Sequence, residues 1–304
     1  MTTGQHACLL PFMRVVRDHE IALKRARKST TTNLSKSNMV AITPFVLAAL
    51  ASAYNYVHPL NNAVQQGSTQ NGTAARGIRY TMGNRVLVKD VNLYMIYYGE
   101  WTETQKTILD KFASNIGSSD WYKLTKLYYY QASSSAKKTY VDGVVKVAKS
   151  VSDTGSKGKS LSGSDLPDLV QSLVDSGALP EDEDGIYFIN TSGEVAESIR
   201  PDLGTASFCS DYCGYHVTTE LKSGKRVQYA MVGNPISCIS GCAPSQNQKL
   251  SPNGDAGVDA MLSVFAHELT EAVSDPISDI DAERAWQDAN GSVSDFIFHT
   301  LIIL

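Results

Sequence analysis

The chain has 304 residues, of which 42% are hydrophobic and 19% charged, and its formal net charge at pH 7 is −4. This composition excludes a disordered, collagen-like or coiled-coil protein. The acidic balance argues against a nucleic-acid-binding protein, which should be basic. The sequence contains no apolar stretch of the roughly 18 residues that a membrane-spanning helix needs, so we expect no transmembrane segment.

The start of the chain has the pattern of a secretory signal preceded by unrelated sequence. Residues 1–38 are basic and polar, whereas the residues from Met39 form a short apolar run that ends in Ala51-Ser-Ala53, the small-residue pattern that signal peptidase accepts. The alternative, a buried helix, is weakened by Pro44 within the run. We interpret 1–38 as a leader from a wrongly chosen start codon and 39–53 as a signal peptide.

Beyond the signal, the sequence predicts one folded domain with a mixed central sheet. Residues 54–84 are polar and read as an exposed N-terminal arm, and the domain is expected over 85–295. Residues 86–98 are rich in β-branched and aromatic residues and predict a strand. We then expect a helix capped by Thr102, strands over 121–131 and 139–147, a helix over 165–177, a strand over 185–190 and a hairpin over 215–232. Helices and strands mix without a strict rhythm, which indicates an α/β or α+β class.

Four cysteines remain after the signal, in two pairs with three residues between the members of each pair. They are Cys209, Cys213, Cys238 and Cys242. In a secreted protein such a set predicts two disulfides, in one of three connectivities that the sequence leaves open. A four-cysteine zinc site is the alternative, although such sites usually use C-x2-C spacing. Sequons compatible with a secreted glycoprotein occur at Asn71, Asn190 and Asn290.

The chemistry of the chain is concentrated in one apolar segment that begins near Asp259 and ends before Pro276. It predicts a largely buried helix, because the residue before a proline leaves the helical conformation. His267, Glu271 and Asp275 are four residues apart and share one stripe of this helix. A buried helix tolerates such groups only if they are paired or bind a cation.

The segment His267-Glu-Leu-Thr-Glu271 resembles the H-E-x-x-H zinc-protease helix with its second histidine replaced. We therefore predict a metal site with His267, Glu271 and Asp275 as ligands and Glu268 as the group that polarises a water molecule. A further ligand must come from beyond the helix. Asp288 is the nearest candidate, followed by Asp279, Asp281 and His216.

Three readings of this helix stay open. Zn²⁺ with hydrolysis would make the protein a zinc-dependent hydrolase such as a peptidase. Ca²⁺ would make the group a structural site, since hard cations prefer oxygen ligands. Without a metal, Glu268 and Glu271 would lie on the solvated side of an amphipathic helix, and His216 would be held structurally by the neighbouring crosslink.

Several segments together resemble the phosphate-induced protein 1 or Exordium-like family of secreted plant and oomycete proteins. They run from Leu93 to Trp101, Ser119 to Trp121, Gly185 to Phe188, Phe208 to His216, Tyr229 to Asn234, Cys238 to Ala243 and Ser251 to Asp259. The resemblance covers about residues 83–295. It implies an extracellular, cell-wall-associated protein that binds an unknown wall or extracellular ligand and has no established biochemical activity.

Two departures from the family pattern limit what the resemblance implies. Plant members carry an apolar stretch where this chain has His267 to Glu271, so the family supplies no catalytic role for those residues, and we assign the chain to an oomycete-like branch. The family also continues with Cys- and Trp-containing sequence where this chain has the apolar residues 296–304, which we interpret as an aberrant tail.

Overall fold

The computed structural model describes residues 78–199, 206–243, 248 and 251–287. The expected leader, signal peptide and tail lie outside these described residues. The centre of the fold is a five-stranded sheet in the order β5-β2-β7-β10-β9. Its strands are β2 (Val91–Tyr98), β5 (Val145–Asp153), β7 (Ile186–Thr191), β9 (Gly214–Glu220) and β10 (Arg226–Gly233). The first four in spatial order are parallel and β9 is an antiparallel edge strand, so the predicted mixed sheet is confirmed.

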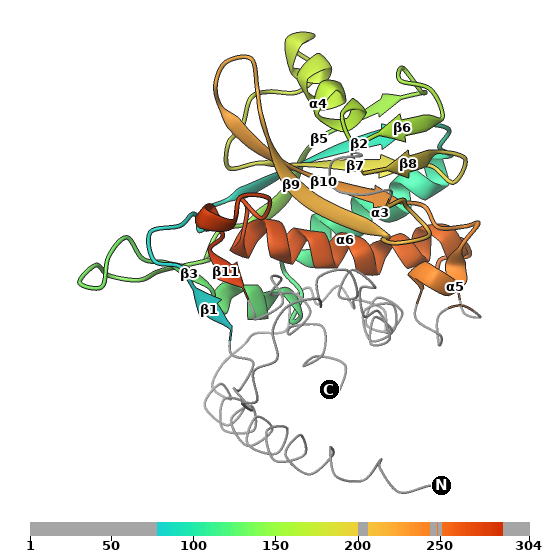
Figure 1. Ribbon diagram of the computed structural model, residues 1–304. Coiled ribbons are helices and arrows are strands. Elements are labelled where there is room, and N and C mark those ends of the chain that lie inside the picture. Colours follow the sequence, from blue (N-terminus) through green and yellow to red (C-terminus); the bar gives the residue numbers. More distant parts are fainter. Residues whose placement is uncertain (1–77, 200–205, 244–247, 249–250, 288–304) are drawn as a thin grey trace, which may run out of the picture. The chain divides into compact units, whose positions relative to one another are not determined.

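Helices cover both faces of this sheet. The helices α3 (Glu103–Ile116) and α6 (Ala256–Ser274) lie side by side on one face, and α4 (Asp165–Asp175) lies on the other (Figure 1). The chain passes from β2 through α3 to β5 and returns through α4 to β7. Both crossovers join parallel strands, which defines a doubly wound α/β arrangement with an antiparallel edge.

Smaller elements surround the sheet. They are β1 (Arg79–Tyr80), the 3-10 helix Tyr122–Leu127, β3 (Tyr129–Tyr130), β4 (Thr139–Tyr140), β6 (Ser160–Ser162), β8 (Ala196–Ser198), α5 (Ile239–Cys242), the 3-10 helix Asp281–Glu283 and β11 (Trp286–Gln287). The strand β1 pairs with β11 in antiparallel fashion, so residues that the sequence assigned to the N-terminal arm take part in the fold.

The prediction of a strand over 121–131 is wrong. Tyr122 to Leu127 form a 3-10 helix, and only two residues of the segment enter β3. Tyr122 and Thr125 are each 1% exposed, so burial repeats every third residue, as in a 3-10 helix, and not every second residue as in a strand. The Thr125 hydroxyl lies 3.4 Å from that of Thr270 in α6, which fixes this turn against the helix.

The predicted strand over 139–147 is divided in two. Residues 139–140 form β4, and β5 starts only at Val145 and runs on to Asp153. Gly143 lies in the interruption, where a β-carbon would come within 1.8 Å of the carbonyl oxygen of Lys89. This close approach of two backbones requires glycine and interrupts the strand pattern.

The other predicted helices and the hairpin are confirmed. Thr102 caps α3 in a capping box, accepting a hydrogen bond from the backbone N–H of Gln105, whose side chain in turn accepts from the N–H of Thr102. The strands β9 and β10 form the predicted hairpin. The last helix is buried as expected, since within α6 only Ala256 and His267 are not buried, and the ring of Phe265 stacks on that of Phe188 in β7 at 3.8 Å.

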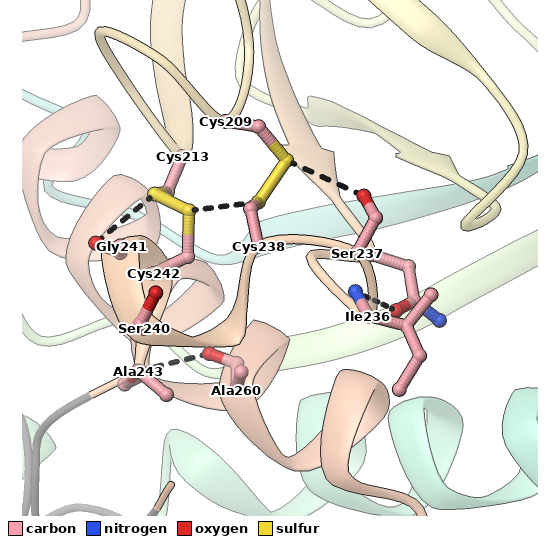
Figure 2. Close-up of a disulfide and its surroundings, with 12 residues drawn as sticks. Cys209, Cys213, Ile236, Ser237, Cys238, Ser240, Gly241, Cys242, Ala243 and Ala260 are labelled. Carbon is pink, nitrogen blue, oxygen red and sulfur yellow. Dashed lines mark hydrogen bonds between the residues drawn. A yellow bond between two sulfur atoms is a disulfide. The ribbon is translucent and has the colours of Figure 1, made fainter.

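Both predicted disulfides are present, and the structure determines their pairing. Cys209 is bonded to Cys238 and Cys213 to Cys242, each bond joining residues 29 positions apart (Figure 2). They tie the segment that enters β9 to the loop and short helix α5 that follow β10. Because all four sulfur atoms are paired, the four-cysteine zinc alternative is excluded.

Removing a disulfide should lower stability substantially. A bond that closes a loop of this length stabilises a fold by about 2–4 kcal/mol. We expect the double variant Cys213→Ala/Cys242→Ala to lose that much free energy of unfolding, measured by urea titration. Reduction of the wild type should lower stability further, because it opens both bonds. An unchanged urea midpoint in the double variant would contradict this role.

A buried carboxylate lies on the sheet face opposite α6. Glu197 in β8 is 2% exposed and accepts hydrogen bonds from the hydroxyls of Tyr212 and Tyr215, the latter at 3.0 Å. Burial raises the pKa of Glu197 above its ordinary value of 4.5, although both hydroxyls partly offset this effect.

This shift predicts a pH dependence of stability. As pH rises above 4.5, the unfolded chain ionises at Glu197 before the folded protein does, so stability contributed by the protonated acid is lost as pH rises through the folded pKa. We expect Glu197→Gln to gain stability relative to the wild type between pH 4.5 and neutrality, measured by urea unfolding. The exposed Glu220→Gln serves as control, and a stability difference between Glu197→Gln and wild type that does not change with pH would refute the assignment.

Candidate metal centre

The candidate site forms where β9 crosses beneath α6. Ala230 in β10 pairs with both Phe188 and His216, and Phe188 stacks on Phe265 of α6. Residues paired across a sheet point to the same face, so His216 is directed at α6. Asp255 caps the start of α6 by accepting a hydrogen bond from the N–H of Val258 at 3.0 Å.

Three buried side chains meet at this crossing. His216 Nδ1 lies 3.3 Å from Glu268 Oε2 and 3.2 Å from Glu271 Oε2. One candidate ligand atom from each of the three residues lies within 4.8 Å of the other two. His267 is adjacent, with its Nε2 3.3 Å from Glu271 Oε1. We call His216, Glu268 and Glu271 the His/Glu/Glu group.

The other ring nitrogen fixes the orientation of the histidine. His216 Nε2 lies 3.1 Å from the main-chain carbonyl oxygen of Asp275. A carbonyl only accepts hydrogen bonds, so Nε2 carries a hydrogen and Nδ1 faces the two carboxylates. Two negative oxygens around one ring nitrogen require a positive charge between them, either a proton on Nδ1 or a metal ion.

The pKa shifts of His216, Glu268 and Glu271 reflect the same need for a positive charge between the carboxylates. Burial lowers the pKa of His216, but the contacts with both glutamates outweigh burial and raise it well above 6.5. Burial raises the pKa of Glu268. Burial also acts to raise the pKa of Glu271, but the neighbouring His267 and His216 lower it well below its ordinary value. Without a metal the group is therefore held together by a shared proton and charge pairing.

The three ligands predicted from the helix stripe do not all lie in the His/Glu/Glu group. Glu271 belongs to the group and His267 contacts it. The Asp275 carboxylate instead accepts a hydrogen bond from the N–H of Ala285 at 2.5 Å, and burial raises the pKa of Asp275 to about 6. Its carbonyl orients His216, as an outer partner of a metal ligand does. Asp288 lies outside the described residues.

Glu268, which the sequence predicts to polarise a water molecule, is 1% exposed, and its carboxylate lies among the candidate ligand atoms. Its catalytic role stays a prediction. Of the reserve candidates, Asp279 accepts a hydrogen bond from the Thr218 hydroxyl at 2.8 Å, and Asp281 pairs with Arg284. Neither joins the group.

His216 lies at the centre of the group, although the sequence makes it only the last of the further ligand candidates and predicts that the neighbouring crosslink holds it. The sequence of β9 hides this role, because Tyr215 and Val217 are the apolar residues of the alternation, yet Gly214 and His216 are the buried ones. The expected sequon at Asn190 is also informative, because that side chain is fully buried in β7 and closed to a glycan.

The fold and the site together define the class of protein. It is a disulfide-bonded, doubly wound α/β domain with a buried His/Glu/Glu group against its last helix. Among the described residues, no helix is long and apolar enough to cross a membrane. The chain belongs to the phosphate-induced protein 1 family, because the model of the phosphate-induced protein 1 conserved region matches residues 78–286. The resemblance inferred from the sequence motifs is thereby confirmed.

Curated relatives agree with this assignment. Protein EXORDIUM-like 3 of Arabidopsis thaliana is 31% identical over 66% of this chain and 62% of its own length. EXORDIUM-like 5 of the same plant is 30% identical over 69% of the chain and 60% of its own. Protein PHOSPHATE-INDUCED 1 of Nicotiana tabacum is 25% identical over 63% of each. The chain thus spans less than two thirds of the length of these relatives, and no solved structure matches it.

Proposed function

We propose that this protein is a secreted, extracellular Exordium-like protein whose His/Glu/Glu group binds one divalent metal ion. One observation carries the proposal: two buried carboxylates converge within 3.3 Å of a single imidazole nitrogen. Buried charges are tolerated only when they are paired or coordinate a metal. A metal ion would take the place of the proton on His216 Nδ1 and would use ligands that are already assembled.

The donor set favours zinc over calcium. An imidazole nitrogen with two carboxylates is a ligand set typical of Zn²⁺, whereas Ca²⁺ takes six to eight oxygen ligands. The hydrogen bond from His216 Nε2 to the Asp275 carbonyl is the kind of outer contact that orients metal-binding histidines. A hydrolytic role for Glu268 stays a prediction, and we propose metal binding without catalysis.

Secretion to the apoplast or cell wall is supported by two features. Both disulfides lie in the described domain, and disulfides persist in oxidising compartments. The run from Met39 to Ala53 has the length and ending of a signal peptide.

The metal proposal predicts zinc content and metal-dependent stability. Protein expressed through a secretory pathway should hold about one zinc per chain by elemental analysis. At free zinc a hundredfold above Kd, binding adds about 2.7 kcal/mol, which raises the Tm of a domain of this size by roughly 5–10 °C. Chelation should reverse this increase.

Two variants separate the site from non-specific binding. Glu268→Gln keeps the shape of the side chain and removes its charge, and it should lose both the zinc and the response to chelation. Glu220→Gln removes an exposed carboxylate at the far end of the same strand as His216 and should retain both. Circular dichroism checks that each variant is folded. Zinc absent from folded wild type, or equally retained by Glu268→Gln, would refute the proposal.

Secretion is tested by expressing the chain from Met39 in a eukaryotic secretory host. Mature protein in the medium should begin at Tyr54, directly after the small-residue ending at Ala53. N-terminal sequencing measures this. Protein that stays inside the cells with residues 39–53 attached would contradict the signal-peptide interpretation.

A further inference from the structure

A second feature of the fold lies at the other end of α6. The carboxyl ends of β2, β7 and β10 border a cavity of about 530 Å³, within the usual size range of small-molecule sites. Ala256, the first residue of α6, lines it, whereas Glu268 lies twelve residues further along, about 18 Å away. The cavity and the His/Glu/Glu group are therefore separate sites.

The position of the cavity follows from the topology. The chain leaves β2 for β5 on one side and enters β7 on the other, so the strand order reverses between β2 and β7. In doubly wound folds, ligands bind at the carboxyl ends of the strands at such a switch point.

The lining of the cavity argues against an anionic ligand. Glu100, Glu194 and Asp255 line it, and none of the lining residues in the described part of the chain is basic. The start of α6 is capped, because Asp255 accepts from the N–H of Val258 and, at 2.8 Å, from the side chain of Gln105. One of the helix N–H groups that could hold a phosphate is thus already engaged, and three carboxylates repel a phosphate.

One side-chain donor in the cavity wall is available to a ligand. Asn234 is 4% exposed, and its Oδ1 accepts a hydrogen bond from the N–H of Ile236 at 3.1 Å. Its Nδ2 has no hydrogen-bond partner among the described residues, although Asn234 lines the cavity. A ligand acceptor at this point of the cavity would give Nδ2 a hydrogen bond that no described residue provides.

The remaining wall is partly apolar. Ile236 also lines the cavity, is 52% exposed, and lies away from the two disulfides (Figure 2). It offers an aliphatic surface beside the polar groups. A ligand that fits must therefore accept from an amide, donate to carboxylates, and present C–H groups.

We propose that this cavity binds a neutral, polyhydroxylated ligand of sugar type. A hydroxyl group accepts from Asn234 Nδ2 and donates to the Glu194 or Glu100 carboxylate, so one class of group satisfies both requirements. The C–H face of a sugar ring packs against Ile236. The proposal does not depend on the metal site.

The test is saturation-transfer NMR on the folded wild-type protein. The probe is an equimolar mixture of glucose, galactose, mannose, xylose and arabinose, with glucosamine and glucose 6-phosphate measured separately. At least one neutral sugar should show transfer, and glucose 6-phosphate should show none. Asn234→Asp keeps the acceptor for the Ile236 N–H but replaces the donor with a charged oxygen, and it should weaken neutral-sugar binding at least tenfold.

The control is a variant remote from the cavity. Glu220 lies at the opposite end of the strands from the cavity, in register with Arg226 at the start of β10. The variant Glu220→Gln should therefore bind the neutral sugar like wild type. Thermal melting confirms that both variants are folded. The proposal is overturned if no neutral sugar binds, if only glucosamine binds, or if Asn234→Asp leaves sugar binding unchanged.

Discussion

The structure depends on keeping two carboxylates inside a buried helix. Glu268 and Glu271 are 1% and 8% exposed within α6, which packs against β9, β10 and α3. Two such charges are tolerated only with a positive partner, which His216 supplies to both, with His267 beside Glu271. The register of β9 on β10, the position of α6 over both strands and the carbonyl of Asp275 all serve to place this imidazole. Apolar residues at the helix positions would need none of these constraints.

The disulfides hold the same region from outside. Cys213 directly precedes β9 and lies three residues before His216, and its bond to Cys242 joins the start of β9 to the segment between β10 and α6. The strand that carries His216 is therefore tied covalently to α5, which packs against α6.

Local sequence signals predicted an element correctly where a single residue pattern dominated its segment. The capping residue Thr102 and the β-branched and aromatic residues of β2 led to correct elements. The segment from Tyr122 failed because its aromatic residues suggested a strand, while burial against α6 imposed a three-residue repeat. For the site, helix spacing identified Glu271 and its neighbours, since those contacts lie within one element. His216 required knowledge of which face of β9 meets α6, and that depends on strand pairing 14 residues away at Ala230.

Anomalous diffraction from crystals of the secreted protein, collected on both sides of the zinc absorption edge, tests the central claim most directly. The account predicts one anomalous peak about 2.0–2.1 Å from His216 Nδ1, in contact with carboxylate oxygens of Glu268 and Glu271. A crystal grown with zinc that shows no peak at this position, with the three side chains arranged around a proton alone, would contradict it.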